Sequence, residues 1–398
     1  MNRNFIMNNS SGLSFPFTFI NIKRSFPAYF LMLLMVGCTS NDGSSGIDNL
    51  ESIVLTEDLV IPAESDDVLI GNFKGLSVDK SGNMYVADTR LQKIHQFSSE
   101  GRYRESIGRE GKGPEEFEGL NSNIKIKSDT LYVLQNNARE IDLFDLNSNQ
   151  HIRTVNIKDA ELDNRSIGSP QNMFPLPNGD ILVSFSNPYF RVPEEGDEPH
   201  YITVSKINPY GTFIDLKILQ LPELYPSNQK LVYLESNSMT VFTTEFYPDI
   251  EMASDREGNL YIGKSDSLNF QQYNQDGELI GEPKGISRPV PFTSSDLDSL
   301  ANDRMSTFKK AVNEAGEPDY WPSFQSFTVD ESGRYWVQQH HPGKKVQVWQ
   351  VLDSNGAPQW KFELPADVTL FEVTEGRAYG IQDTAEGLPS VIRYNYNI

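Results

Sequence analysis

Residues 76–86 read LSVDKSGNMYV, which is an apolar strand, a tight turn closed by Gly82, and a second apolar strand. One such unit cannot bury its own apolar face, so several copies must stack on one another. The repeat therefore decides the architecture of the chain. The unit occurs six times, at 76–86, 124–134, 173–183, 252–262, 327–337 and 371–381.

The turn inside the unit has a specific chemistry. Asp79, Asp255 and Asp330 each stand three residues before a glycine. Asp favours the first position of a type I turn, where its side chain caps backbone amides, and Gly favours the last, where φ is often positive. Apolar residues alternate in the flanks with the period of two that is typical of strands. We therefore interpret these Asp residues as turn caps, not as catalysts.

Each unit is followed by a second hairpin, so the repeat contains four strands. A spacing of about 45 residues with four strands per repeat is typical of a propeller blade. Two longer gaps between units each hold an insertion, which keeps the count at six. The sequence thus predicts an all-β fold, a six-bladed β-propeller with four-stranded blades. The second-hairpin turns lie at 98–101, 208–211, 274–277 and 353–356.

The sixth copy is incomplete. After 371–381 only one more strand, 391–396, precedes the end of the sequence, so the last blade lacks its outermost strand. A spare strand stands ahead of the first blade at 52–61. We expect this N-terminal strand to close the ring, because an open sheet edge invites aggregation. The alternative is an uninvolved N-terminal linker.

Composition excludes one class of partner. The chain has 398 residues, 38% hydrophobic and 11% aromatic, which is enough for a packed core. Its net charge is −21, and the three basic residues of 1–37 leave the remainder with −24. Such a surface repels phosphates, so we expect no nucleic-acid partner and a monomeric domain.

The N-terminal segment has the pattern of an export signal. Lys23 and Arg24 precede an apolar run at 26–37, which ends at Cys38, the single cysteine of the chain. A basic region followed by a short apolar run is typical of a secretory signal, and this run is too short to span a bilayer.

The end of that run, LMVGC at 34–38, resembles a bacterial lipobox, with Met35 in place of the usual Leu. We therefore predict a signal peptide over 1–37, a lipid anchor on Cys38, a tether over 38–50 and the propeller over 51–398. The lipid then attaches the domain to the cell envelope, at its outer membrane. The sequence does not indicate whether the domain faces the periplasm or the outside. The alternative is an ordinary signal peptide with a coincidental cysteine.

Two stretches of the first blade carry a family resemblance. VADTRLQKI at 86–94 and IGREGKGPEEF at 107–117 resemble the strand and the interblade linker of NHL-type propeller repeats. Together with the lipobox, the chain resembles the six-bladed β-propeller lipoproteins of Bacteroidota, in the NHL/TolB-like superfamily. The resemblance implies a fold and an envelope location, and it implies no particular activity.

An insertion at about 284–324, between blades 4 and 5, changes to helical periodicity over 294–315. Ser295 and Asp298 have capping spacing, and Gly316 is a stop signal. The helix is either a packing element or a lid that binds a partner. Its apolar face is predicted to contain Leu297, Leu300, Met305, Phe308 and Val312.

A second insertion at about 221–247 is rich in Tyr, Phe and Thr, and it predicts an extra hairpin. Both insertions precede the innermost strand of a blade, so both should rise on the same face of the propeller. Loops on a rigid scaffold commonly carry function. That shared face is therefore the predicted binding surface.

The sequence lacks the common catalytic motifs, namely GxSxG, HExxH, a P-loop, GxGxxG and CxxC. Of the five histidines only His340 and His341 are adjacent, and neighbours in a strand point to opposite faces. We interpret this pair as part of an ordinary loop. The fitting function is a non-catalytic module that binds a protein, peptide or glycan, with no cofactor.

One enzymatic alternative stays open. Gluconolactonase-type propellers hold Ca²⁺ with oxygen ligands from their inner strands, and oxygen ligands suit Ca²⁺. Asp249 and Glu251 are two residues apart and share a face, so they are the weak candidates for a metal in the central channel of a lactonase-like hydrolase or lyase. The full set of channel or ligand-binding candidates is Asn121, Asn123, Gln171, Asp249, Glu251 and Gln325.

Overall fold

The chain divides into two compact units, 1–43 and 44–398, and all described residues belong to the second. The predicted signal segment and Cys38 lie outside the described residues, as does His341. The computed structural model describes residues 49–398, apart from 63, 66–67, 136–138, 188–191, 227–229, 236–237, 288, 303, 305, 341–344 and 384–387.

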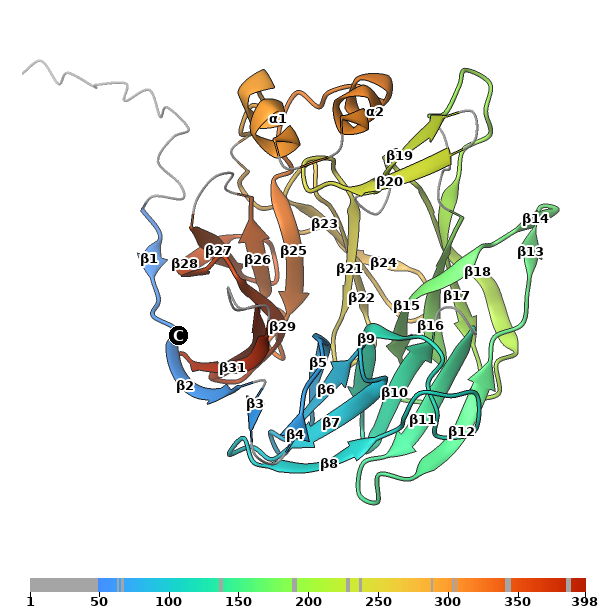
Figure 1. Ribbon diagram of the computed structural model, residues 1–398, viewed down its shortest axis with the longest axis vertical. Helices are drawn as coiled ribbons and strands as arrows, with labels where there is room; N and C mark the ends of the chain where they lie inside the picture. Colours follow the sequence, from blue (N-terminus) through green and yellow to red (C-terminus); the bar gives the residue numbers. More distant parts are fainter. Residues whose placement is uncertain are drawn as a thin grey trace, which may run out of the picture. The chain divides into compact units, whose positions relative to one another are not determined.

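The described chain forms six antiparallel sheets of four strands each, and blade 5 carries one extra parallel strand. This confirms the six-bladed β-propeller (Figure 1). The first strand of each blade contacts the first strand of a neighbouring blade, so these six strands surround the central channel. Blades 1 to 3 are β5 (Phe73–Val78), β6 (Met84–Asp88), β7 (Lys93–Phe97), β8 (Tyr103–Ile107); β9 (Leu120–Lys127), β10 (Thr130–Gln135), β11 (Glu140–Asp145), β12 (His151–Asn156); and β15 (Ser169–Pro175), β16 (Ile181–Ser186), β17 (Tyr201–Ile207), β18 (Phe213–Pro222).

The remaining blades follow the same order along the chain. Blades 4 to 6 are β21 (Ile250–Ser254), β22 (Leu260–Lys264), β23 (Asn269–Tyr273), β24 (Leu279–Gly281); β25 (Phe324–Val329), β26 (Tyr335–Gln339), β27 (Val346–Leu352), β28 (Pro358–Pro365); and β29 (Val368–Thr374), β30 (Arg377–Asp383), β31 (Pro389–Asn395), β2 (Thr56–Ile61). Outside the blades are β1 (Glu51–Ser52), β3 (Glu64–Ser65), β4 (Val68–Leu69), β13 (Glu161–Leu162), β14 (Arg165–Ser166), β19 (Lys230–Glu235), β20 (Ser238–Thr243), α1 (Ser294–Ala301) and α2 (Thr307–Ala315).

The recurring Asp is a turn cap, as predicted. In blade 1 the carboxylate of Asp79 accepts hydrogen bonds from the backbone amides of Ser81 and Asn83, at 2.8 and 2.9 Å. Gly82 has φ +80°, a conformation that favours glycine. The Asp side chains of the turns are therefore used by the scaffold itself.

Ring closure occurs at the N-terminal strand. β2 pairs antiparallel with β31 and supplies the outermost strand that the sixth blade lacks. The single predicted strand at 52–61 is in fact two strands, because β1 pairs in parallel with β28 of blade 5. Ile53 and Leu55, in the crossing between them, pack on the core between blades 5 and 6. The N-terminal segment therefore joins two blades.

The core lies between neighbouring blades. Phe117 of the interblade linker is completely buried and packs edge-to-face on Phe144 of blade 2. Gly108 of the same linker has φ +78°, and a Cβ there would lie 2.2 Å from the Phe117 ring. The glycine of the linker is thus required by the close approach of this aromatic ring.

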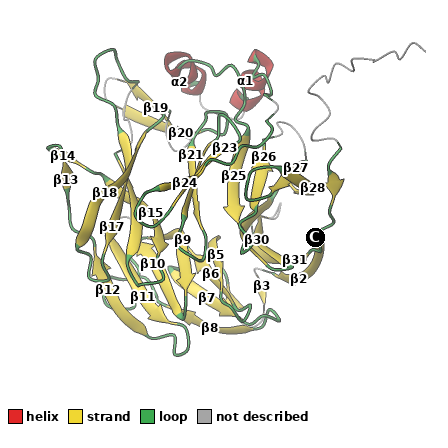
Figure 2. Ribbon diagram, turned by 180° about the vertical axis from the view of Figure 1, so that it is seen from behind, coloured by secondary structure: helices red, strands yellow, loops and turns green. Residues whose placement is uncertain are grey.

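Both insertions lie on one side of the propeller, which we name the insertion face, and Figure 2 shows α1 and α2 beside β19 and β20 there. They share one apolar cluster, which includes Leu231, Phe242, Phe246, Phe308 and Trp321. The shared face is confirmed. We name the opposite side, which carries the Asp-x-x-Gly turns, the turn face.

Two details of the helical insertion were predicted wrongly. The segment forms two helices, α1 and α2, where one helix over 294–315 was expected. The N-cap is Thr293, whose side chain accepts a hydrogen bond from the Asp296 backbone amide. The Asp296 carboxylate in turn accepts from the Thr293 backbone amide, so the pair at Ser295 and Asp298 does not cap the helix. Phe292, just before the cap, packs in the same apolar cluster as Leu297 and fixes the earlier start.

Candidate functional site

The predicted candidate residues all lie on or directly before innermost strands, toward the insertion face. Each stands at or near the start of an innermost strand, where the chain arrives from that face. Asn121 and Asn123 lie on β9, Gln171 on β15, Glu251 on β21 and Gln325 on β25, and Asp249 directly precedes β21.

The amide residues of blades 2 and 3 hold neighbouring strands together. Asn123 Nδ2 donates to the Gln171 carbonyl at 2.9 Å and to Asn172 Oδ1 at 3.3 Å. Asn121 Oδ1 accepts from the Asn123 backbone amide at 2.7 Å. These contacts join blade 2 to blade 3, so the side chains have a structural use.

The Gln325 side chain forms its hydrogen bonds within blade 5 and, among the described residues, bonds to none of the other candidates. Its Oε1 accepts from Gln338 Nε2 at 2.7 Å, and its Nε2 lies 3.0 Å from His340 Nδ1. The His340 ring stacks on Trp321 at 4.2 Å between centroids. This network connects blade 5 to the apolar cluster under the helices.

Asp249 and Glu251 lie close together. Burial raises the pKa of Glu251 to about 8, and the negative charge of Asp249 adds to the effect. Asp249 Oδ1 accepts from the Ile250 backbone amide at 2.8 Å. In the described part of the chain, no three His, Cys, Asp or Glu side chains are placed to hold a metal ion. Near neutral pH, Glu251 is therefore mostly protonated in the metal-free chain and can donate a hydrogen bond.

A cavity of about 830 Å³ opens beside blade 3. It is built mostly by segments outside the regular blade, namely the β13–β14 hairpin and, from the connection between β16 and β17, Asn187 and residues 197–200. Leu234 of the hairpin insertion also borders it. Three separate connections therefore converge on one space, next to an insertion.

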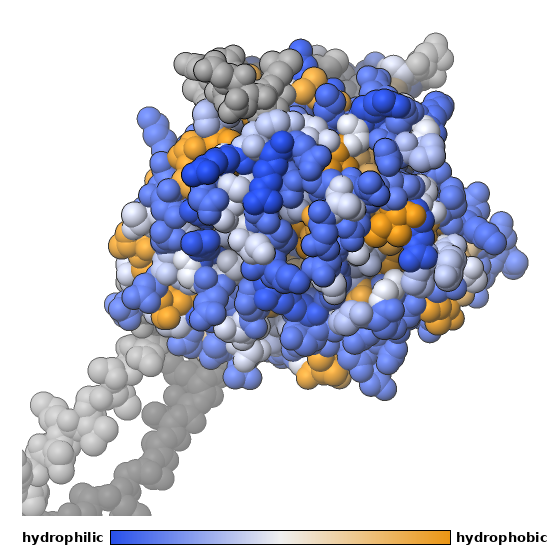
Figure 3. Space-filling view, turned by 90° about the horizontal axis from the view of Figure 1, so that it is seen from below, coloured by the Kyte–Doolittle hydropathy of each residue, from blue (hydrophilic) through white to orange (hydrophobic). Residues whose placement is uncertain are grey.

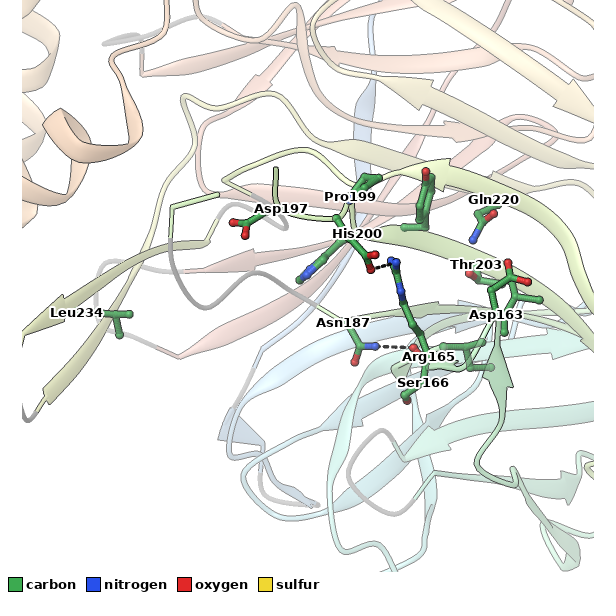
Figure 4. Close-up of a pocket in the computed structure, with 14 residues that line it drawn as sticks. Asp163, Arg165, Ser166, Asn187, Asp197, Pro199, His200, Thr203, Gln220 and Leu234 are labelled. Atoms are coloured by element: carbon green, nitrogen blue, oxygen red, sulfur yellow. Dashed lines mark hydrogen bonds and ion pairs between the residues drawn. The ribbon is translucent and has the colours of Figure 1, made fainter. Parts of the chain in front are cut away.

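Polar contacts tie these connections to one another. Arg165 of β14 forms an ion pair with Glu198. Asn187 Nδ2 donates to the carbonyl of Ser166 at 2.7 Å. Figure 4 shows Arg165 of β14 around the same space as Asn187 and His200, which both come from the connection between β16 and β17. The cavity is thus framed by side chains that already bridge its walls.

The blade supplies the rest of the lining. Tyr201 and Thr203 come from β17 and Gln220 from β18, and Thr203 is 3% exposed. β17 is hydrogen-bonded to β16 on one side and β18 on the other, so it offers side chains and not an open strand edge. The lining is therefore mixed: hydroxyl, amide, imidazole and phenol groups stand beside four charged residues and four apolar ones.

Charge at the cavity is acidic overall. The ion pair of Arg165 and Glu198 neutralises itself, which leaves Asp163 and Asp197 at the cavity. A polyanion is disfavoured there, as it is by the chain as a whole with its net charge of −21.

Sequence reasoning missed this cavity. It assigned the extra residues of blade 3 to 221–247, and β19 and β20 do form the expected hairpin there. The connection 187–200 was overlooked, although the corresponding connection in blade 1 needs only residues 89–92. The sequence feature that could have indicated the cavity is the long interval between the second and third strands of blade 3.

The side of the molecule away from the insertions has fewer features that indicate a binding site. The face seen from below, away from the insertions, is mostly hydrophilic, and its apolar side chains are scattered in small patches (Figure 3). Among the described residues, no helix is long and apolar enough to cross a membrane.

Comparison with known proteins agrees with the fold. A family model described as a 6-bladed beta-propeller matches residues 58–245, which are blades 1 to 3 with β2 and the hairpin insertion. No curated protein sequence matches the chain.

Solved structures show the same architecture at low identity. A member of the duf4221 family from Bacteroides vulgatus is 13% identical, with a TM-score of 0.55, and the match covers 87% of this chain and 99% of that one. A candidate exported protein from Bacteroides fragilis is 11% identical, with a TM-score of 0.51, covering 89% and 97%. A gluconolactonase from Xanthomonas campestris is 13% identical, with a TM-score of 0.43, and the match covers 86% of this chain and 99% of that one.

Proposed function

We propose that this chain is an envelope-anchored, non-catalytic binding protein that holds a partner in the cavity beside blade 3. The observation that carries the proposal is the construction of that cavity. Two segments added to the blade pattern, β13–β14 and the described part of the connection between β16 and β17, border a cavity of about 830 Å³ together with Leu234 of the hairpin insertion. Segments added to a repetitive scaffold are where binding commonly resides.

Among protein, peptide and glycan partners, the lining favours a neutral glycan. Sugar hydroxyls both donate and accept hydrogen bonds, and the side-chain amides of Asn187 and Gln220 offer both kinds of group. Tyr201 adds an aromatic ring, which suits the apolar face of a sugar. An extended peptide can add to an unpaired strand edge; both edges of β17 are paired, but β18, which supplies Gln220, is the outermost strand of its sheet, so a peptide is the second candidate in the test below.

Anchoring belongs to the same proposal. Lipidation at Cys38 would attach the domain to the outer membrane through the tether 38–50, and it would concentrate the binding cavity at the cell envelope. Cys38→Ser is expected to move the chain from the membrane fraction to the soluble fraction of the envelope. Continued membrane association of that variant would contradict the anchor without affecting the argument about the cavity.

The binding proposal is tested with an array of neutral oligosaccharides, acidic oligosaccharides and peptides, probed with the full chain. The expected result is binding to neutral oligosaccharides that falls at least tenfold in Tyr201→Ala and Gln220→Ala. Tyr320→Ala is the matched control, because Tyr320 is 53% exposed and does not line the cavity. Equal loss in the control, or binding only to peptides or acidic sugars, would contradict the assignment.

A further inference from the structure

The central channel contains two lysines from one strand. Lys125 and Lys127 lie on β9, two residues apart, and alternate residues of a strand share a side. Both line a cavity of about 400 Å³ toward the turn face, and Lys125 also lines a space of about 150 Å³ deeper in the channel. This site is separate from the cavity beside blade 3.

These two amines have no carboxylate partner at bonding distance. Lys127 Nζ donates to the carbonyl oxygen of Arg256, across the channel in blade 4. Lys125 makes no hydrogen bond or ion pair with any residue that the structure describes. Lys125 is exposed and Lys127 is partly exposed, so the Lys125 amine is open to the channel, while the Lys127 amine has the Arg256 carbonyl as a partner. Desolvation by the channel walls lowers the pKa of both lysines, against the nearby charges of Glu372 at Lys125 and of Asp255 at Lys127.

The acids around the cavity are already occupied. Asp255 accepts from Asn259 Nδ2 at 2.7 Å and from the Tyr261 hydroxyl at 2.9 Å. Asp330 accepts from Arg334 Nε at 2.7 Å and Trp336 Nε1 at 2.9 Å.

Two further acids near the lysines are also engaged. Glu331 is paired with Arg256. Glu372 faces Lys125 and accepts through Oε2 from the Val78 amide at 2.8 Å and the Ser77 hydroxyl at 3.2 Å. Asp330 and Glu331 are thus paired with arginines, whereas Asp255 and Glu372 bond to neutral donors and keep their charges near Lys127 and Lys125.

We infer that the turn-face half of the channel is a binding site for a small oxyanion, such as a phosphate or a short dicarboxylate, held by Lys125 and Lys127. The amines arise from positions about 6.6 Å apart along β9, which suits two separated negative groups. Hydroxyls of Ser254 and Thr328 line the same cavity and supply further donors. The volume admits a small ion and excludes a macromolecule.

The inference is tested by calorimetric titration of the full chain with sodium phosphate and with sodium succinate, at constant ionic strength. Saturable binding of at least one probe is expected, with affinity reduced at least tenfold in Lys125→Met. Lys125→Arg should retain most of the affinity, because it keeps the charge. Glu372→Gln should bind several-fold more tightly, since it removes the one carboxylate that faces Lys125.

Lys74→Met is the control, because Lys74 pairs loosely with Asp383 at the surface and lines neither space. In the unmodified chain, either anion should also protect Lys125 from an amine-reactive label, read by peptide mass spectrometry. No saturable binding of either probe, or binding that survives Lys125→Met, overturns the inference. If the Lys125 variants do not fold, absence of protection at Lys125 overturns it.

Discussion

The closing strand is held by an ion pair that is open to direct test. Arg393 of β31 donates to both carboxylate oxygens of Asp58 on β2, at 2.9 and 2.8 Å. The same guanidinium donates to the Ser99 carbonyl of blade 1 at 2.5 Å. The two side chains are 9% and 23% exposed. One arginine therefore links the closing strand, the sixth blade and the first blade.

Asp58→Ala removes this link while leaving the guanidinium in place. Removing one partner of a buried pair costs about 3–5 kcal/mol, and an exposed pair is worth about 0–1 kcal/mol. Asp58 is partly exposed and Arg393 keeps Ser99, so we expect a loss of about 2–3 kcal/mol in the free energy of unfolding. With an unfolding entropy of about 2.1 cal/mol/K per residue over roughly 350 residues, the melting temperature should fall by about 3–4 °C.

The effect should depend on pH in a defined direction. Burial works to raise the pKa of Asp58, but the hydrogen bonds and charge of Arg393 outweigh it and hold that pKa below the ordinary value. The stabilisation is therefore present above the ordinary carboxylate pKa and is lost as pH falls through the folded-state value. The difference between Asp58→Ala and the unmodified chain should shrink in acid.

Thermal and denaturant unfolding of the full chain provide the assay, with hydrogen exchange of β2 and β31 as a local readout. Lys112→Ala is the matched control, because its ion pair with Glu118 is also 2.8 Å long but its side chain is 80% exposed. The control should change stability by less than about 0.5 kcal/mol. An Asp58→Ala effect no larger than the control would refute the reasoning about ring closure.

Three further predictions concern buried groups. The pKa of Glu251 is raised to about 8, so the folded chain binds this proton more tightly than the unfolded chain, and the stability that the proton contributes is lost as pH rises from about 4.5 to 8. Glu251→Gln should therefore gain stability relative to the unmodified chain over that pH interval, measured by denaturant titration. A stability difference that stays constant with pH would contradict this prediction. Asp88 is buried, and its carboxylate accepts hydrogen bonds from His95 and from the backbone amides of Gly71, Asn72, Arg90 and Leu91. Asp88→Asn should therefore lower the free energy of unfolding by about 3 kcal/mol. A loss below about 1 kcal/mol would show that the neutral amide replaces the carboxylate. Phe308 is 0% exposed in the insertion cluster, so Phe308→Ala should cost about 3–5 kcal/mol locally and speed amide exchange in α2 and β19–β20; equal acceleration in all blades would instead show that the insertions and the blades unfold together.

The fold was largely predictable because each copy of the repeat carries its own local instructions. Asp79 and Gly82 define one turn completely, and the alternation around them sets the strand faces. The repeat calls for a fourth strand beside β31, and β2 of the N-terminal segment takes that place. Its division into β1 and β2 was not predictable, because it depends on Ile53 and Leu55 packing between two blades.

The helix cap shows where local reasoning runs out. Thr293 with Asp296 and Ser295 with Asp298 both have the spacing of a capping pair. Sequence spacing alone does not choose between them. The burial of Phe292 and Leu297 in the insertion cluster does, and that is a tertiary contact.

The candidate sites were harder still. The channel amides such as Asn123 and Gln325 were located on the correct strands, but their contacts with Gln171, Gln338 and His340 come from strand neighbours that the motif did not specify. The cavity beside blade 3 depends on three connections meeting in space. Such convergence leaves only a weak trace in the sequence, the long interval over 187–200.

The central claim is that the cavity beside blade 3 binds the partner. Hydrogen–deuterium exchange of the full chain, with and without the oligosaccharide that binds best on the array, tests it most directly. The account predicts slower exchange in β14, β17 and the described part of 187–200, with no change on the turn face. Protection confined to the channel or to the turn face, with none around Arg165 and Tyr201, would contradict it.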